Sequence, residues 1–128
     1  IDVTVISDGV NLASRLEGLT KTYDTPFLFS ESLLEESEKM SGLYFRYLGQ
    51  VYVKGKSIPQ KIYELFNADE PEQIEKKLKT KEKFELALNI FFSGNFVDSE
   101  KLFREILRTN ENDTVCQYYL NQLAIQSH

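Results

Sequence analysis

A chain of 128 residues with 41% hydrophobic and 27% charged residues has an ordinary globular composition, which excludes disordered and collagen-like proteins. With 15 Lys and Arg against 20 Asp and Glu, the net charge of −5 gives no support for a nucleic acid partner. One cysteine, Cys116, and one histidine, His128, exclude an internal disulfide and a Cys/His metal site. No apolar run is long enough to span a membrane, so we expect a cytoplasmic protein.

The first part of the chain alternates between strand and helix patterns. β-branched residues over 1–6 predict a strand, and because a chain seldom starts in mid-strand we expect a fragment of a longer protein. Asp8 is a suitable N-cap for an amphipathic helix over 10–23, where leucines recur at helical spacing. A short strand over 27–29 and a helix over 31–40 are predicted to follow.

A hairpin and then a helical region follow. Aromatic and β-branched residues predict strands over 43–53 and 58–66. Composition then changes near Asn67 to Pro71, which divides the chain into two domains: 1–68, an α/β (α+β) partial sheet with flanking helices, and 69–128, an all-α helical-hairpin tail. Ile74 and Leu78 predict the first helix of the tail, and further apolar periodicity predicts the others, giving helices near 72–80, 84–92, 96–110 and 113–125.

The chemically informative stretch lies in the predicted helix over 10–23. Asn11 and Arg15 are four residues apart, so their side chains emerge from the same helix face. An amide beside a guanidinium can hold a ribose and neutralise a phosphoryl oxygen. By itself such a pair is more often a polar face in contact with water, so its context has to decide.

Two motifs supply that context. The run 4–17 (TVISDGVNLASRLE) closely resembles the signature of the class III adenylate/guanylate cyclases. Further on, 48–56 (LGQVYVKGK) resembles the closing hairpin of that family, which ends in a tyrosine-glutamate strand, here Tyr63 and Glu64. The resemblance covers 1–66 and implies the C-terminal half of a cyclase catalytic domain, of the threonine-type adenylate cyclase subgroup.

The resemblance implies a role for each matched residue. Asn11 would orient the ribose of ATP, Arg15 would stabilise the transition-state phosphate, and Lys54 would meet the terminal phosphates. Thr4 would hydrogen-bond the adenine amino edge, although it can also be read as an ordinary β-branched strand residue. Lys56 is more simply a solvated lysine of the turn.

The chain also departs from the family pattern. Ser7 stands where the family usually has glycine, and the two metal-binding aspartates of these enzymes precede the matched segment. Asp2 and Asp8 do not replace them, so Mg²⁺ or Mn²⁺ would be a cofactor of the parent enzyme, with none bound by this chain, which we predict to be inactive alone. Family sites form between two catalytic domains, which implies a homodimer or a pair with a related cyclase domain.

The tail resembles a tetratricopeptide-type helix pair. With Gly94 at the turn, Ala87 and Ser99 fall at the small positions of the repeat, and Phe103 and Ile106 at large ones. Such repeats need neighbours for stability, so we expect the tail to pack on the first domain or to dock against a protein partner.

Two hypotheses of function remain. The first is an adenylate cyclase fragment, whose parent joins the ribose 3′-oxygen of ATP to the α-phosphate and releases pyrophosphate. The alternative is a non-catalytic, cyclase-like dimerisation module with a partner-binding tail. Phe92, Tyr118 and Tyr119 would form that binding face unless they are core aromatics, and Cys116 is expected to be a buried apolar residue, not a nucleophile.

Overall fold

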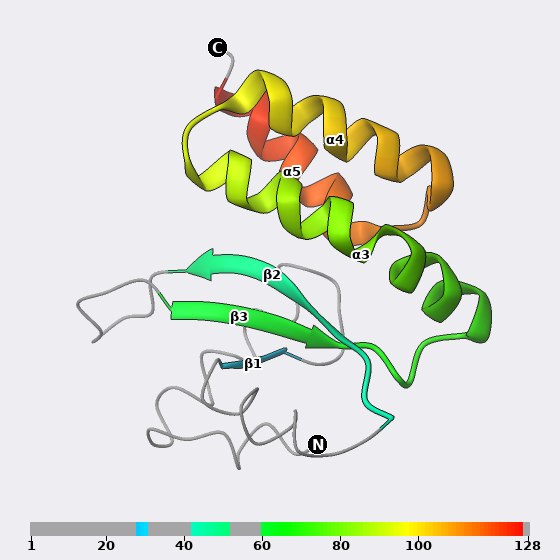
Figure 1. The fold of residues 1–128 in the computed structure, drawn as a ribbon. Coiled ribbons are helices and arrows are strands. Elements are labelled where there is room, and N and C mark those ends of the chain that lie inside the picture. Colours follow the sequence, from blue (N-terminus) through cyan, green and yellow to red (C-terminus); the bar gives the residue numbers. More distant parts are fainter. Residues whose placement is uncertain (1–27, 31–41, 52–59, 127–128) are drawn as a thin grey trace. The chain divides into compact units, whose positions relative to one another are not determined.

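The chain divides into two compact units, Ile1–Ala68 and Asp69–His128, which we call the sheet unit and the helical unit and describe separately. The computed structural model describes residues 28–30, 42–51 and 60–126 (Figure 1).

Several predicted elements cannot be compared with this structure. The strand over 1–6 and the helices over 10–23 and 31–40 lie outside the described residues, as do the residues between the two predicted strands of the hairpin.

The described residues of the sheet unit form a three-stranded antiparallel sheet. Its strands are β1 (Leu28–Ser30), β2 (Phe45–Val51) and β3 (Gln60–Leu65), and β3 lies between the other two (Figure 1). The predicted hairpin is thus confirmed, since β2 and β3 pair antiparallel, and the strand predicted at 27–29 is present one residue later.

The central strand carries the core of the sheet. Consecutive residues of a strand point to opposite faces, and in β3 the four consecutive residues from Ile62 to Leu65 are all buried, so both faces of this strand are covered. Leu48 of β2 and Phe66, directly after β3, are also almost fully buried.

The helical unit consists of three helices, α3 (Pro71–Phe92), α4 (Phe96–Thr109) and α5 (Thr114–Gln126). The prediction of two separate helices near 72–80 and 84–92 is wrong, because α3 runs through both. The residues between them contain neither Gly nor Pro, and nothing in that stretch interrupts the backbone hydrogen bonds of a helix. The predictions near 96–110 and 113–125 are confirmed within one residue at each end.

Local signals define the turns between these helices. Pro71 opens α3, where its missing N–H costs no hydrogen bond. Gly94 adopts a φ of 93°, which favours glycine, and Asn95 caps α4 by accepting a hydrogen bond from the Asp98 N–H. Asp113 caps α5 in the same way through the Cys116 N–H. These short turns place α4 against both α3 and α5.

The core of the helical unit is largely aromatic. Phe103 of α4 meets Phe84 of α3 edge to face and stacks on Tyr119 of α5, with ring centroids 6.0 and 5.5 Å apart. Ala87 and Ser99 are fully buried, at the small positions that we predicted for a close helix crossing. Leu78, one of the two residues that predicted a helix near 72–80, is 43% exposed. The buried stripe of α3 consists of Lys77, Thr80, Phe84, Ala87 and Leu88.

Candidate functional site

The residues predicted to contact the nucleotide lie outside the described part of the chain. This holds for Thr4, Asn11, Arg15 and Lys54, so their proximity to one another stays a prediction. What the structure does describe is the hairpin whose connecting residues include Lys54. Val51 and Gln60, which flank those residues, are paired across β2 and β3.

A bulge interrupts the pairing of this hairpin. Near the connecting residues Gly49 lies opposite Ile62, whereas on the other side of the bulge Tyr47 lies opposite Tyr63, so Leu48 is the extra residue of β2. Gly49 has a φ of 122°, a backbone conformation that an L side chain rarely adopts. The glycine therefore allows β2 to change its register against β3 at this point.

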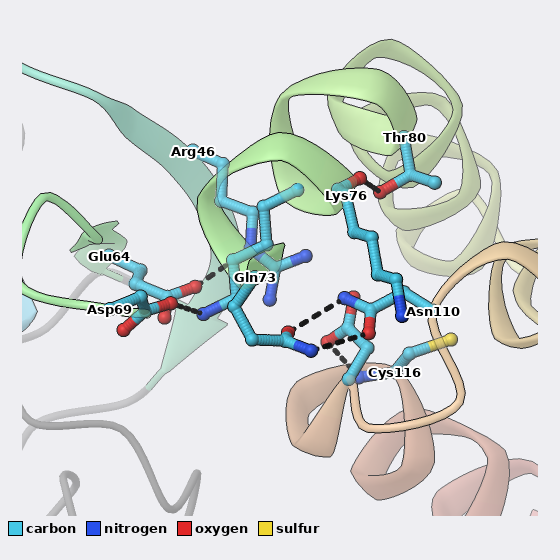
Figure 2. Close-up of polar contacts among 10 residues, drawn as sticks. Arg46, Glu64, Asp69, Gln73, Lys76, Thr80, Asn110 and Cys116 are labelled. Carbon is cyan, nitrogen blue, oxygen red and sulfur yellow. Dashed lines mark hydrogen bonds and ion pairs between the residues drawn. The ribbon is translucent and has the colours of Figure 1, made fainter. Parts of the chain in front are cut away.

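The register change aligns two opposite charges. Arg46 lies directly opposite Glu64, and its Nε donates a hydrogen bond of 2.8 Å to Glu64 Oε1 (Figure 2). Both residues are only 1% exposed. An uninterrupted ladder from the Gly49–Ile62 pair would instead place Arg46 opposite Leu65. The bulge is thus required for the ion pair, which compensates two charges that would be costly to bury singly.

This ion pair was not predicted from the sequence, where Glu64 was noted only as part of a tyrosine-glutamate motif and Arg46 was given no role. Arg46 and Glu64 are the only opposite charges that lie one on each of the two predicted strands over 43–53 and 58–66, which was a usable signal, but whether they lie opposite each other depends on the bulge. A glycine inside an otherwise aromatic and β-branched strand was the indication that a bulge occurs.

A second polar group closes the open end of the hairpin. Asn67 follows β3, and its Oδ1 accepts a 2.6 Å hydrogen bond from the Tyr44 N–H. Its Nδ2 donates to the Gly42 carbonyl at 2.7 Å. The Phe66 N–H donates to the Tyr44 carbonyl at 2.9 Å, and the two rings stack. One asparagine side chain therefore ties the segment before β2 to the segment after β3.

The helical unit has its own polar junction. The Gln73 and Asn110 amides exchange two hydrogen bonds of 3.0 Å each, which join the first turn of α3 to the end of α4 (Figure 2). Asn110 is fully buried, and Asp113, which caps α5, is buried as well. This junction, which we define as Gln73, Asn110 and Asp113, brings the ends of all three helices together.

One lysine of α3 is buried. Lysines usually lie at the surface, and Lys79 and Lys83 are indeed exposed. Lys77 is instead 8% exposed, and its Nζ lies 2.5 Å from Asp69 Oδ2. The ion pair explains why a charge is tolerated on the buried stripe of α3. Lys77 and its partner Asp69 both belong to the helical unit.

Among the described residues there is no cluster of three or more His, Cys, Asp or Glu that could hold a metal ion, and no buried side-chain nitrogen or oxygen lacks a hydrogen-bond partner. Cys116 is fully buried, and its Sγ donates to the Phe103 carbonyl at 3.1 Å, which confirms a structural thiol. None of the helices in this part of the chain has the length and apolarity that a membrane span requires.

The three aromatics of the suggested binding face separate by exposure. Tyr119 is 3% exposed and belongs to the core, Tyr118 is half-buried, and Phe92 is exposed. Tyr119 nevertheless touches both of the others, with ring centroids 5.2 Å from Tyr118 and 6.3 Å from Phe92. The prediction of core aromatics is therefore right for Tyr119 and wrong for Phe92.

Known proteins with similar sequences share one name. The chain is 44% identical over 66 residues to an adenylate cyclase of Anabaena cylindrica, a match that covers 51% of this chain and 13% of that protein. It is 40% identical over 65 residues to adenylate cyclase 1 of Rhizobium meliloti, covering 51% of this chain and 10% of the relative.

A third relative extends the similarity over both units. It is the terminal-differentiation specific adenylate cyclase of Dictyostelium discoideum, 26% identical over 128 residues, which is 99% of this chain and 6% of that protein. No family model matches the chain, and no solved structure is significantly similar to it. The chain spans between 6% and 13% of the length of these curated relatives, and the shared name supports a relationship with adenylate cyclases.

Proposed function

We propose that this chain is part of an adenylate cyclase, of the threonine-type class III subgroup, that converts ATP into cyclic AMP and pyrophosphate. In this reaction the ribose 3′-oxygen bonds to the α-phosphorus, the bond from that phosphorus to the β-phosphate bridging oxygen breaks, and the 3′-hydroxyl proton is released. The observation that carries the proposal is the 44% and 40% identity to two proteins named adenylate cyclase. These similarities support a cyclase-related function, and the subgroup and the reaction are the proposal.

In the proposed reaction this chain contributes cationic and polar contacts to the nucleotide. Arg15 neutralises charge that develops on the α-phosphate in the transition state, and Asn11 orients the ribose from the same predicted helix face. Thr4 hydrogen-bonds the adenine amino edge, and Lys54 binds the terminal phosphates. Arg15 thus has the largest expected effect on turnover.

The described hairpin supports the proposal for Lys54. Val51 and Gln60 are partners in the ladder, so residues 52–59 begin and end at the same end of the hairpin. The strands that lead there are fixed by the Arg46–Glu64 ion pair. A phosphate-binding lysine carried by a braced pair of strands would be held more firmly than one in an isolated loop.

The metal ions of such an enzyme need other ligands. Mg²⁺ or Mn²⁺ would activate the 3′-hydroxyl and stabilise the departing pyrophosphate. The proposed contacts here are an amide, a guanidinium, a hydroxyl and an ammonium, which are not the carboxylates that these hard cations prefer. We therefore assign no metal-dependent step to this chain, and expect carboxylates from upstream residues or from a partner domain, with ATP bound between the two.

For the tail we propose a tetratricopeptide-like helix pair formed by α3 and α4. The positive φ of Gly94 at the turn, and the complete burial of Ala87 and Ser99, support this comparison. The continuation into α5 is compatible with a further repeat.

The first experiment measures cyclic AMP formed from ATP by an N-terminally extended parent protein, with Mg²⁺ or Mn²⁺, beside this 128-residue chain. We expect activity in the parent alone. In the parent, Arg15→Ala should reduce kcat about 100-fold or more, with a much smaller change in KM, because a transition-state contact is removed. An equal loss in nucleotide binding and in turnover would contradict the role given to Arg15.

The connecting residues of the hairpin offer a matched control. Lys54→Ala should weaken nucleotide and pyrophosphate binding, whereas Lys56→Ala, a change of the same kind two residues away, should leave both unchanged. Equal effects of the two variants would mean that Lys54 contributes only nonspecific positive charge and makes no specific contact with the phosphates. A folded, dimeric parent without any activity would favour the alternative, a non-catalytic cyclase-like dimerisation module.

A further inference from the structure

The bulge in β2 separates two stretches of strand pairing. On the side of the ion pair, Tyr47 lies opposite Tyr63, and on the side of the connection to β3, Gly49 lies opposite Ile62. In an uninterrupted antiparallel ladder, each step along one strand is matched by one step along the other. The two pairings differ by one residue, so the bulge is what allows both of them in the same hairpin.

The bulge depends on the backbone conformation of one residue. Gly49 has a φ of 122°, which an L side chain rarely adopts. Any other residue at this position would therefore favour a ladder without the bulge. Such a ladder can keep the pairing on one side only, and it should keep the side that is held more strongly.

The side of the ion pair is the stronger one. Arg46 and Glu64 are both 1% exposed, with 2.8 Å between Nε and Oε1, and a register change on this side would move two buried charges apart (Figure 2). On the side of the connection, Gln50 lies opposite Lys61, whose side chain is exposed. A register change there separates no buried charges, so this side should give way.

The change would displace the start of the connection between the strands. With Arg46 kept opposite Glu64 and no bulge, residue 50 would lie opposite residue 60, and the connection would run over 51–59 instead of 52–59. β2 would shift against β3 by about 3.3 Å from this point on, the rise of one strand residue. Gln50 would also move to the other face of the sheet.

We infer that Gly49 is a positioning residue for the phosphate contact proposed at Lys54. Bulges are common next to active sites, where they change the direction of a nearby side chain. Lys54 follows Gly49 in the chain by five residues, so the register that Gly49 permits sets where the segment carrying Lys54 leaves the ladder. The inference rests on the proposed function, because that proposal assigns the phosphate contact to Lys54.

The test compares two substitutions of the same kind, Gly49→Ala and Gly42→Ala. Gly42 also has a positive φ, 85°, and open space where a Cβ would lie, so alanine strains the backbone there as well. It precedes β2 and thus lies at the end of the hairpin away from the connection. Both variants should lose stability, but only Gly49→Ala should change the register.

NMR of the 128-residue chain measures the register without any nucleotide. In Gly49→Ala, the cross-strand contacts of residue 49 should move from Ile62 to Lys61, while Arg46 stays opposite Glu64. In Gly42→Ala, all of these contacts should stay as they are.

Calorimetry with the N-terminally extended parent, pyrophosphate and Mg²⁺ measures the effect on binding. Gly49→Ala should weaken pyrophosphate binding about tenfold, the size expected for one hydrogen bond to a charged group, and Gly42→Ala should change it by less than about twofold. Combining Gly49→Ala with Lys54→Ala should add nothing to the loss from Lys54→Ala alone. A purely structural role of Gly49 would give additive losses.

An insertion keeps the inference testable if Gly49→Ala does not fold. One alanine inserted after Val51 lengthens the connection by one residue, as the register change would, and leaves the bulge intact. It should weaken pyrophosphate binding to a similar degree.

Four results would each overturn the inference: a bulge that persists in Gly49→Ala, a register change without weaker binding, additive losses in the double variant, or unchanged binding after the insertion. A parent that binds pyrophosphate through Lys54 but forms no cyclic AMP would instead overturn the proposed reaction, and the role of Gly49 in binding would stand.

Discussion

Each of the two units of this chain is stabilised by a different kind of internal contact. In the sheet unit, one buried ion pair and one bulge set how β2 pairs with β3. In the helical unit, the arrangement rests on many separate contacts, which are caps, an amide pair and aromatic stacking. A single charge should therefore matter far more in the sheet unit than any single polar group in the helical unit.

The reason lies in the range of the interactions. Helix pairing in the second unit follows from signals only a few residues apart, such as the Gly94 and Asn95 turn. Strand register is a non-local property, and a slip by one residue moves every side chain to the other face. A buried pair such as Arg46 and Glu64 penalises that slip, because it would move the two buried charges away from each other.

The largest expected effect comes from removing one member of the buried pair. Glu64→Ala leaves the Arg46 guanidinium buried without its carboxylate, and should lower the free energy of unfolding of the sheet unit by about 3–5 kcal/mol. Urea denaturation, followed by amide resonances of each unit, measures this. As a control, the double variant Arg46→Leu with Glu64→Leu should lie within about 1.5 kcal/mol of the original chain. A loss below about 1 kcal/mol in Glu64→Ala would mean that the pair does not set the register.

In the helical unit, removing a buried apolar side chain should lower the free energy of unfolding more than removing a polar contact. Leu88 is fully buried on α3, so Leu88→Ala should cost about 2–5 kcal/mol through lost apolar contacts and a cavity. Leu78→Ala removes the same atoms from an exposed position of the same helix, and should stay within about 0.5 kcal/mol. Thermal unfolding of the two variants compares them directly. Similar losses in both would show that α3 presents a different face to the core.

The polar junction should contribute less than the buried leucine. Asn110→Ala removes the partner of the Gln73 amide in a buried position, and should cost about 1–3 kcal/mol. Combining it with Gln73→Ala should add little, because both variants remove the same two hydrogen bonds. A double-mutant cycle in urea measures the coupling. Fully additive losses would indicate that the two side chains act independently.

The smallest expected effect concerns a helix cap. Asn95→Ala removes the side chain that accepts from the Asp98 N–H, and should cost about 1 kcal/mol. Asn95→Ser, which keeps an acceptor, should recover most of this loss when both are measured in urea. If serine and alanine behave alike, the Gly94 turn holds the start of α4 without the cap.

The sequence contained most of the information about the helices and the hairpin. Recurring apolar residues predicted α4 and α5, and aromatic and β-branched runs predicted β2 and β3. The continuity of α3 was missed because the spacing of apolar residues changes near Lys81. Ile74 and Leu78, which predicted the first part of the helix, do not belong to its buried stripe. The true stripe includes Lys77, whose charge hides it from a reading based on hydrophobicity alone.

The residues of the candidate site were predicted from a family resemblance and not from periodicity. Asn11 and Arg15 were identified through a family signature, and physical reasoning about the pair alone would have favoured a solvated surface. The buried Arg46–Glu64 pair is the opposite case, because the structure shows an ion pair although the family motif had included Glu64 without any role for Arg46. Whether Arg46 and Glu64 lie opposite each other depends on a bulge, and a linear sequence does not fix the position of a bulge.

The polar junction also has a dynamic consequence. Hydrogen bonds of Gln73, Asn110 and Asp113 join the first turn of α3, the end of α4 and the start of α5, whereas the Asn95 cap at the opposite end lies in the turn between α3 and α4. Local opening of the helical unit should therefore begin at the end of α5 and proceed toward the junction. Amide hydrogens would then exchange with solvent fastest near Ile125 and slowest in the middle of α4. A hinge of this kind would let α5 fray and close again while α3 and α4 stay paired.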